Sequence, residues 1–229
     1  MMRKRWYSAN KEDAMRKIAY IIKFTSKRKY ADALCNGSFF MHPAHYYQAL
    51  KNGWGDALEG AFSHLYIPEK RLYLPIYSLY VVYEDQVHDH RITIDARMMD
   101  HFGSYYATIF KWEDWALFMQ SHCFTQTYAY GLVTYQDMNL ETFTRLVNNH
   151  RYEHLLTKRP SYHYQHEFRL IIDDPLSKEE MMIGKMYHAT TLMPKGTIVD
   201  MKKCLKDHDY FMIDMNGAMI YCDYENLMS

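Results

Sequence analysis

The sequence predicts a single α+β domain whose core is a split, mixed or antiparallel β-sheet with helices at its periphery, because three observations agree. Short apolar or alternating segments typical of strands recur along the 229 residues. Segments with helical spacing separate them without a regular alternation of strand and helix. No linker rich in Pro, Gly or Ser divides the chain. We therefore expect one domain over residues 1–229, with 1–19 as a basic arm that includes a short helix.

The first half of the chain predicts a compact strand–helix–strand unit after the arm. Residues 11–19 have the polarity of a short helix, and the apolar run 19–24 is typical of a strand. Ser26 is a suitable helix cap, and Gly37 stands where a left-handed residue ends a helix. A strand over 38–41 and a helix over 44–52 follow, and then a glycine-containing loop over 53–62.

The second half alternates strands and helices irregularly. Apolar and aromatic helical patterns cover 112–122 and 140–149. Apolar or alternating segments predict strands over 72–83, 91–95, 105–110, 128–135, 162–172, 196–201, 210–215 and 218–224.

Composition and charge limit the classes of function. The net charge is zero, but residues 1–30 hold ten basic and two acidic side chains, so a phosphate backbone could be attracted there. An ordinary solvated arm explains the same charges. The four cysteines are scattered, which fits a reducing cytoplasm. No secretory signal and no run of 18 apolar residues is present, so we expect no membrane partner.

One acid interrupts an aromatic and apolar strand pattern. In "YHYQHEFRLII", residues 162–172, an extended chain places Gln165, Glu167 and Arg169 on one face and apolar residues on the other. Two interpretations remain open. Glu167 and Arg169 could form ion pairs across an exposed face, or this polar face could line a cleft in which Glu167 accepts hydrogen bonds.

The beginning of the predicted domain offers a second polar site. A strand that leads through Thr25 and Ser26 into a helix leaves hydroxyls and backbone N–H groups at a helix N-terminus, which suits an anion or phosphate. Lys23, Lys27 and Arg28 add positive charge. A capped helix with a solvated basic first turn is the alternative interpretation.

These two stretches resemble known proteins. "IIKFTSKRKYADALCNGSFFMHP" resembles the opening of ADP-ribosyltransferase folds, and "YQHEFRLII" resembles the strand that presents the catalytic glutamate in those enzymes, above all in DarT-type toxins. The chain as a whole resembles a group of bacterial and phage proteins. That resemblance depends on four stretches, which are Asn36-Gly37, residues 56–60, residues 75–80 and residues 162–169.

The resemblance implies transfer of ADP-ribose from NAD to a protein or nucleic acid, in conflict between bacteria and phage. Glu167 matches the glutamate that hydrogen-bonds the nicotinamide-side ribose. The resemblance also implies that Tyr46, Tyr47 or Trp54 could stack on the nicotinamide and adenine rings. The implied NAD-contacting residues are Lys23, Thr25, Ser26, Tyr47, Gln165 and Arg169.

Two other functions stay open. Transferases of this fold hold NAD with an Arg or His in the first strand, where this chain has Lys23, and Lys lacks the planar fork of Arg. A non-catalytic protein that binds a nucleotide or a partner on the same scaffold is therefore the first alternative. Asp56 and Glu59 could form a lid, a second acid site or a metal site, and with Glu167 they suggest a metal-dependent nuclease. The close histidine pairs lack the companions of a zinc motif, so we predict no bound metal.

Overall fold

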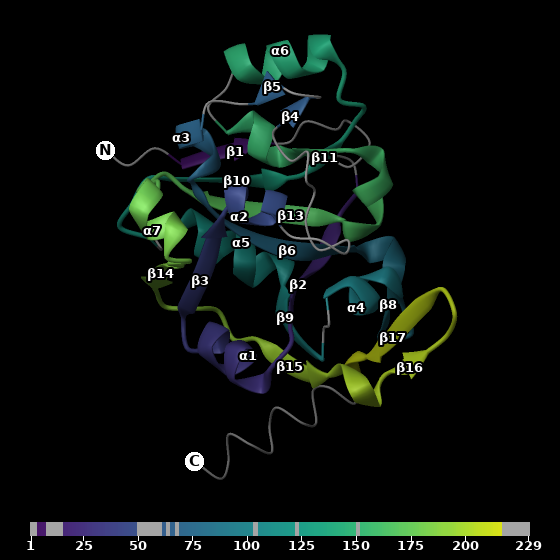
Figure 1. Ribbon diagram of the computed structural model, residues 1–229. Helices are drawn as coiled ribbons and strands as arrows, with labels where there is room; N and C mark the ends of the chain where they lie inside the picture. The colour runs from purple at the N-terminus through teal and green to yellow at the C-terminus, as the bar shows by residue number, and fades with distance from the viewer. Residues whose placement is uncertain are drawn as a thin grey trace. The chain divides into compact units, whose positions relative to one another are not determined.

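The computed structural model describes residues 4–7, 16–49, 61–62, 65–66, 69–102, 105–121, 124–149 and 152–216 (Figure 1). It has a mixed α/β architecture in which most strand pairs are antiparallel. Its contacts group the chain into two compact units of three segments each. Unit 1 comprises Met1–Ala14, Phe39–Ser78 and Phe124–Thr190, and unit 2 comprises Met15–Ser38, Leu79–Cys123 and Thr191–Ser229. No linker rich in Pro, Gly or Ser marks this division in the sequence.

Unit 1 is built on a sheet in the order β1-β10-β13-β6, in which β6 contributes its residues 75–78. Strand β3 pairs with β6 through His42 and Ile76, and β14 pairs with β3. The bounds are β1 Lys4–Tyr7, β3 Ser38–Pro43, β6 Pro75–Tyr83, β10 Tyr128–Leu132, β13 Glu167–Ile172 and β14 Tyr187–Thr190.

The first strand corrects the prediction of a basic arm. Residues 4–7 form β1, which runs parallel to β10 with Lys4 opposite Tyr128 and Tyr7 opposite Gly131. This segment therefore belongs to the sheet. Residues 16–17 are not helical and β2 begins at Ile18, so the helix predicted over 11–19 is wrong at its C-terminal end, and residues 11–15 lie outside the described part.

The remaining elements of unit 1 are short. Strand β11 (Thr134–Tyr135) pairs in parallel with β12 (Thr157–Lys158), and β4 (Ala61–Phe62) pairs with β5 (Leu65–Tyr66). The helices are α2 Ala44–Ala49, α3 Glu69–Leu72, α6 Leu140–Asn149, α7 Lys178–Met182 and the 3₁₀ helices η3 Glu153–Leu156 and η4 Pro160–Gln165. Buried apolar residues of β6, β10, β13 and η3 share one core cluster, which includes Ile76, Ala129, Leu155 and Ile171.

Unit 2 contains an antiparallel sheet in the order β6-β2-β9-β15, in which β6 contributes residues 79–83. Helices α1 (Arg28–Cys35) and α5 (Trp112–Gln120) both pack against β2 and β9, and their buried residues include Ala31, Leu34 and Trp115. The strands are β2 Ile18–Thr25, β9 Tyr106–Lys111 and β15 Thr197–Asp200.

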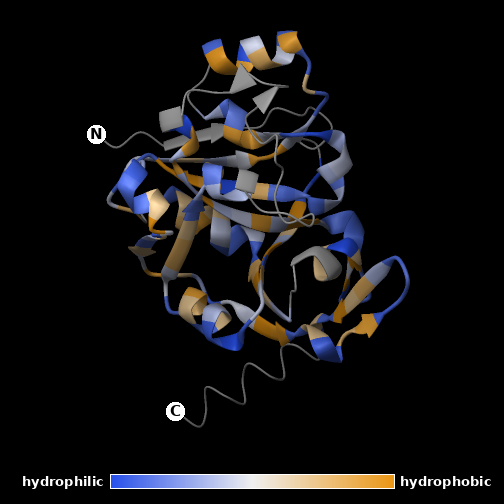
Figure 2. Ribbon diagram, in the orientation of Figure 1, coloured by the Kyte–Doolittle hydropathy of each residue, from blue (hydrophilic) through white to orange (hydrophobic). Residues whose placement is uncertain are grey.

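A second small sheet completes unit 2, in the order β16-β17-β8-β7. Its strands are β7 Val87–His88, β8 Arg91–Asp95, β16 Leu205–Lys206 and β17 Tyr210–Asp214, and the remaining helices are α4 Arg97–Phe102, η2 Glu84–Gln86 and η5 Met201–Lys203. Figure 2 shows hydrophobic residues concentrated on strands such as β3 and β17, whereas helix α6 carries both hydrophobic and hydrophilic residues. Among the described helices, none has both the length and the hydropathy that a membrane crossing requires.

The helix after Thr25 agrees with the sequence in part. Gly37 has φ +82°, the left-handed conformation predicted for a residue that ends a helix. The predicted cap was wrong, because the N-cap is Lys27 and no side chain caps this helix end. The strand predicted over 218–224 lies outside the described residues.

Candidate functional site

The predicted acid lies at the first residue of a buried strand in unit 1. Strand β13 begins at Glu167, and every residue of β13 is buried. The six residues Pro160–Gln165 form helix η4, and the predicted strand over 162–172 is therefore wrong in its first half. His166 joins the two elements with φ 36° and ψ 55°, a left-handed conformation that costs a non-glycine residue about 1–2 kcal/mol.

The carboxylate of Glu167 lies between two cations. Arg169 donates from Nε to Oε1 at 2.7 Å and from Nη2 to Oε2 at 3.3 Å. The ammonium of Lys158, which comes from β12, lies 2.7 Å from Oε2. The three side chains are 6%, 2% and 9% exposed, respectively. Both carboxylate oxygens are therefore engaged by cations within a nearly dry environment.

Further hydrogen bonds fix these three side chains, and we call Lys158, Gln165, Glu167 and Arg169 the charged cluster. Lys158 donates to Gln165 Oε1 at 2.7 Å, and Gln165 Nε2 donates to the Tyr164 hydroxyl at 3.3 Å. Arg169 also donates from Nη1 to the Leu155 carbonyl. The geometry of the cluster is therefore set by β12, η3, η4 and β13 together.

Burial and charge act in opposite directions on Glu167. Burial by itself raises the pKa of this carboxyl group, but the charges of Arg169 and Lys158 and their hydrogen bonds outweigh burial and hold the pKa below its ordinary value. The group is consequently ionised throughout the physiological pH range. Buried ion pairs contribute little net stability compared with apolar residues of the same shape, so this cluster is weak as a stabilising device. Perturbed charges of this kind concentrate at functional sites.

A buried histidine lies near the charged cluster. His154 in η3 is fully buried, and the Arg71 backbone lies close to its ring. Neither ring nitrogen meets hydrogen-bond geometry with any described residue. Burial first, and then the charges of Arg71 and Arg169, lower the pKa of His154 to about 3. His154 is therefore neutral at neutral pH, and sequence reasoning missed it because nothing around "YEHLLTK" marks it out.

Aromatic rings flank the cluster on helix η4 and strand β11. The Tyr162 ring lies under two cations, with Lys158 Nζ 5.5 Å and the Arg159 guanidinium carbon 5.6 Å from its centroid. The His163 ring packs edge to face against Tyr135 at 5.0 Å, and the Tyr135 hydroxyl accepts a hydrogen bond from Glu167 N at 2.9 Å.

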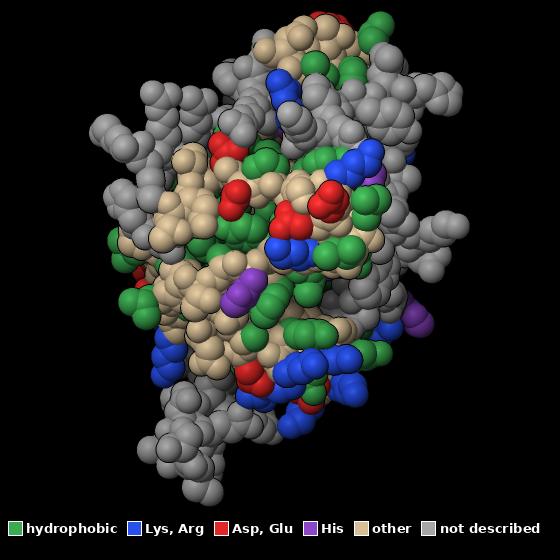
Figure 3. All heavy atoms as spheres, turned by 60° about the vertical axis from the view of Figure 1, so that its left-hand side comes forward, with side chains coloured by type: hydrophobic (Ala, Val, Ile, Leu, Met, Phe, Trp, Pro, Cys, Tyr) green, Lys and Arg blue, Asp and Glu red, His purple; other side chains and the backbone are tan. Residues whose placement is uncertain are grey.

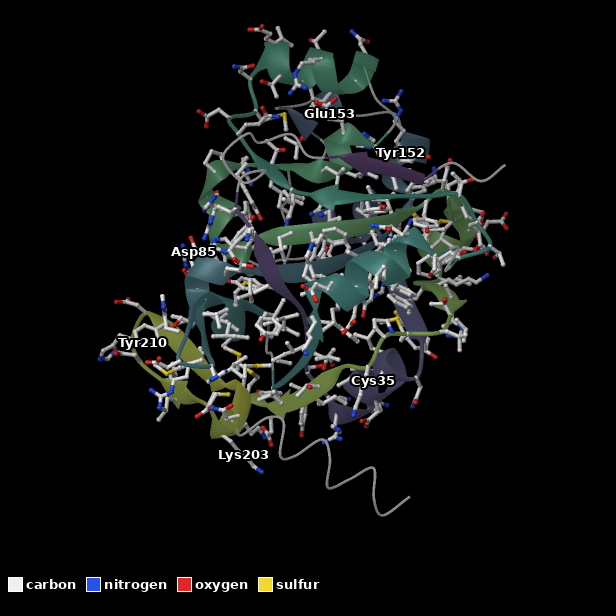
Figure 4. All side chains as sticks on the ribbon, turned by 180° about the vertical axis from the view of Figure 1, so that it is seen from behind. Cys35, Asp85, Tyr152, Glu153, Lys203 and Tyr210 are labelled. Carbon is white, nitrogen blue, oxygen red and sulfur yellow. The ribbon has the colours of Figure 1, made fainter. Side chains whose placement is uncertain are left out.

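Two hydrogen bonds hold the segment that leads into the cluster. The Tyr152 hydroxyl donates to Asp173 Oδ2 at 2.6 Å, which ties the start of η3 to the residue that follows β13. Glu153 forms an ion pair with Arg145 of α6. Figure 4 labels Tyr152 and Glu153, two consecutive residues of the chain at the start of η3. This segment carries His154, Leu155 and Lys158 into their positions.

The structure brings some of the predicted residues together. Gln165, Glu167 and Arg169 belong to one cluster. Gln165 lies on helix η4 and joins the cluster through its hydrogen bond with Lys158, so it shares no strand face with the other two. All three residues are buried, so the interpretation that they form ion pairs across an exposed face is wrong. Tyr47 belongs to unit 1 and contacts His42 and Tyr46 edge to face, at 6.3 Å and 5.6 Å.

Lys23, Thr25 and Ser26 belong to unit 2. Lys23 is half-buried on β2 opposite Thr108, and Ser26 is exposed. The Thr25 hydroxyl lies 3.5 Å from the Lys27 carbonyl, to which it donates. Asp56, Glu59 and Trp54 lie outside the described residues. Within the described residues, no group of three or more His, Cys, Asp or Glu side chains could hold a metal ion.

Comparison with known proteins adds no family to these observations. No family model, no curated protein and no solved structure matches the chain. The charged cluster and the residues of unit 1 that position it are therefore the features that indicate a function.

Proposed function

We propose that the protein is an NAD-dependent transferase of the ADP-ribosyltransferase type, which acts on a macromolecule in conflict between bacteria and phage. Glu167 is the acid at the reaction centre. The observation that supports this proposal best is that an ionised carboxylate is held in a dry environment by two cations on separate elements. A fixed charge of this kind stabilises charge that develops in a transition state far better than a solvated one does.

The proposed reaction requires one well-placed negative charge. The bond between C1′ of the ribose and the nicotinamide nitrogen breaks, and nicotinamide leaves with the electron pair. The ribose then has oxocarbenium character, as in glycoside hydrolysis. A carboxylate beside the ribose stabilises this positive charge and orients a ribose hydroxyl. A nucleophile of the acceptor bonds to C1′ and gives its proton to solvent.

The other members of the cluster have distinct roles in this proposal. Arg169 positions Glu167 through its short hydrogen bond to Oε1 and its longer one to Oε2, and it stays in place. Lys158 holds Oε2 in the free protein and is the group that exchanges, because the phosphates of a dinucleotide offer its ammonium another acceptor. Gln165 keeps Lys158 near the acid. The contacts predicted between NAD and Lys23, Thr25, Ser26 or Tyr47 stay predictions.

A non-catalytic nucleotide-binding protein is the second candidate, and a specific observation favours it. Both oxygens of Glu167 are engaged, and the residue is 5% exposed, so the acid as it stands has no oxygen to offer a ribose hydroxyl. If Lys158 does not exchange, the cluster orders β12, η4 and β13 around a bound ligand and performs no chemistry.

Incubation of the purified protein with NAD separates the two candidates. The transferase predicts release of free nicotinamide, which chromatography detects, and no release from Glu167→Gln. The binding protein predicts stabilisation by NAD or ADP-ribose in a thermal-shift assay without nicotinamide release. The Glu153→Gln variant is the matched control, because it neutralises another ion-paired acid of the same unit.

A second variant protects this test against loss of folding. Glu167→Gln leaves two buried cations without their acid, so Lys158→Met/Glu167→Gln is measured beside it and removes one of them. A folded double variant that still releases nicotinamide would contradict the proposed role of Glu167. Absence of both nicotinamide release and ligand stabilisation in the unmodified protein would overturn both candidates.

A further inference from the structure

Two strands of unit 2 end, and a third begins, at the same end of their sheet. Strand β2 ends at Thr25 and β15 ends at Asp200, and both residues lie opposite Tyr106 at the start of β9. Tyr105 connects them, since its N–H donates to the Thr25 carbonyl at 3.0 Å and its carbonyl accepts from Met201 N at 2.8 Å. The first turn of α1 and helix η5 therefore emerge on either side of Tyr105.

The segments that emerge there carry concentrated positive charge. The first turn of α1 and helix η5, with the residues before them, hold five cations, Lys27–Lys29, Lys202 and Lys203. The same two segments hold two acids, Asp32 and Asp200, so the cations exceed the acids by three. Asp32 pairs with Arg28 at 2.9 Å, and Asp200 accepts from Lys202 N, which caps η5. We call the following set the basic edge: Lys27, Arg28, Lys29, Tyr105, Lys202 and Lys203, all of which are exposed.

The figures agree with this charge distribution. Lys and Arg side chains gather at the lower end of the face in Figure 3. Lys203 extends outward from η5 in Figure 4. A surface with this excess of cations attracts polyanions, and the attraction depends strongly on salt concentration.

Exposed aromatic rings lie among these cations. Tyr105 is 46% exposed, and Lys202 Nζ lies 4.9 Å from the centroid of its ring. Tyr30 in the first turn of α1 is 45% exposed, with Lys29 Nζ 5.3 Å from its ring. The ring of an exposed tyrosine beside an ammonium group can stack on a nucleobase while the ammonium contacts the adjacent phosphate.

We propose that the basic edge binds single-stranded nucleic acid. Its lysines contact the phosphates, and Tyr105 stacks on a base. Exposed rings favour a single strand over a duplex, because the bases of a duplex are already stacked on one another. Only part of this surface belongs to the basic opening of the sequence, since Tyr105, Lys202 and Lys203 are brought beside Lys27–Lys29 by the fold. The proposal depends on unit 2 alone and is independent of Glu167 and of NAD.

Fluorescence anisotropy with labelled 20-nucleotide poly-dT and poly-rU tests this proposal. We expect the unmodified protein to bind at about 50 mM salt and to lose affinity steeply as salt rises. The Lys202→Ser/Lys203→Ser variant should bind more weakly and show a slope of log affinity against log salt that is smaller by about 1.4, or about 0.7 for each lost contact. Tyr105→Ala keeps both backbone hydrogen bonds of Tyr105 and should weaken binding about tenfold.

The matched control removes two lysines from the opposite end of the same strands. Lys17 precedes β2 and Lys111 ends β9, and both are exposed. Lys17→Ser/Lys111→Ser makes the same change in net charge and should leave affinity within about twofold. An equal loss in this control would overturn the assigned surface. Binding of a 20-base-pair duplex as tight as that of the single strands, or binding only to vesicles of anionic lipid, would overturn the assigned partner.

Discussion

At the scale of single residues, the molecule depends most on the compensation of buried charge. Glu167 is kept ionised by Arg169 and Lys158, although burial alone would favour its neutral form. Removal of one charged member of such a cluster lowers the free energy of unfolding by more than the intact cluster adds to it, because the remaining charges stay buried without compensation. This asymmetry predicts which substitutions affect stability most.

We expect Glu167→Gln to lower the free energy of unfolding by about 3–5 kcal/mol, since Arg169 and Lys158 remain buried. Glu153→Gln removes an acid from a pair whose Arg145 side chain is 40% exposed, so its effect should be about 0–1 kcal/mol. Urea unfolding followed by circular dichroism measures both. Equal effects would show that the buried cluster tolerates uncompensated charge.

His154 predicts how stability depends on pH. The pKa of His154 falls from 6.5 in the unfolded chain to about 3 in the folded protein. Between these values the unfolded chain binds a proton that the folded protein does not, so stability falls as pH falls, by about 1.4 kcal/mol per pH unit. Below about pH 4.5 the depressed pKa of Glu167 acts in the same direction.

Substitution of His154 isolates its contribution. His154→Leu should flatten the decline in stability between pH 6.5 and pH 4.5, because no buried imidazole then has to take up a proton. His208→Leu changes an exposed histidine and serves as the control. Urea midpoints at intervals of half a pH unit measure the effect. The prediction fails if His154→Leu and the unmodified protein decline in parallel.

At the scale of elements, the end of α1 shows how one glycine fixes a connection. A Cβ atom on Gly37 would lie 1.8 Å from the carbonyl oxygen of Thr191. The N–H of Thr191 donates to the Gly37 carbonyl at 2.9 Å, which holds the two residues together. Gly184 has a similar φ of +68°, but nothing lies within 4 Å of a Cβ atom there. The two glycines therefore share a left-handed backbone, which would strain any other residue, and differ in steric contact.

This difference predicts unequal effects of alanine. Gly184→Ala should cost about 1–2 kcal/mol, the strain of a left-handed alanine. Gly37→Ala should cost clearly more, because it adds a collision with backbone. Thermal and urea unfolding of the two variants gives the comparison. Similar costs would indicate that Thr191 moves aside freely.

Local sequence patterns predicted most elements of the interior but failed where long-range contacts decide. Strand β8 and helix α6 match their predicted ranges, because their apolar spacing is distinctive. The segment 162–166 has the composition of a strand, but Pro160 begins a 3₁₀ turn and His166 adopts a left-handed conformation. Strand β1 escaped prediction, since four residues become a strand only by pairing with β10.

The candidate site was predictable only in part for the same reason. Gln165, Glu167 and Arg169 are close in sequence, so their proximity could be inferred. Lys158 and His154 reach the cluster from β12 and η3, which fold back through pairings that no sequence pattern specifies. One member of the charged cluster, Lys158, and its neighbour His154 therefore carried no signal in the sequence.

At the scale of the whole molecule, the chain passes between the two units five times, at residues 14/15, 38/39, 78/79, 123/124 and 190/191. Each unit is therefore assembled from three separate segments. The segments of each unit are joined to one another by segments of the other unit. While one unit is folded, it holds these connections short, and its unfolding raises the entropy cost of closing them in the other unit. The units should unfold together.

Hydrogen exchange measured by mass spectrometry checks this expectation. Glu167→Gln changes unit 1, and amides of β2 and β9 in unit 2 should then exchange faster by the same factor as amides of β13. Gly37→Ala changes unit 2 and should accelerate β13 equally. Faster exchange confined to the mutated unit would show that the units open separately.

The interleaved chain path also has a consequence for synthesis on the ribosome. Unit 1 requires residues as late as β14, and unit 2 requires η5 and β17 beyond it. A growing polypeptide therefore holds an incomplete sheet in unit 1 until β14 has been made, and in unit 2 until β17 has been made. Neither unit should acquire its native packing before these late strands have been made, and a product terminated ahead of them should be an early target for chaperones and proteases.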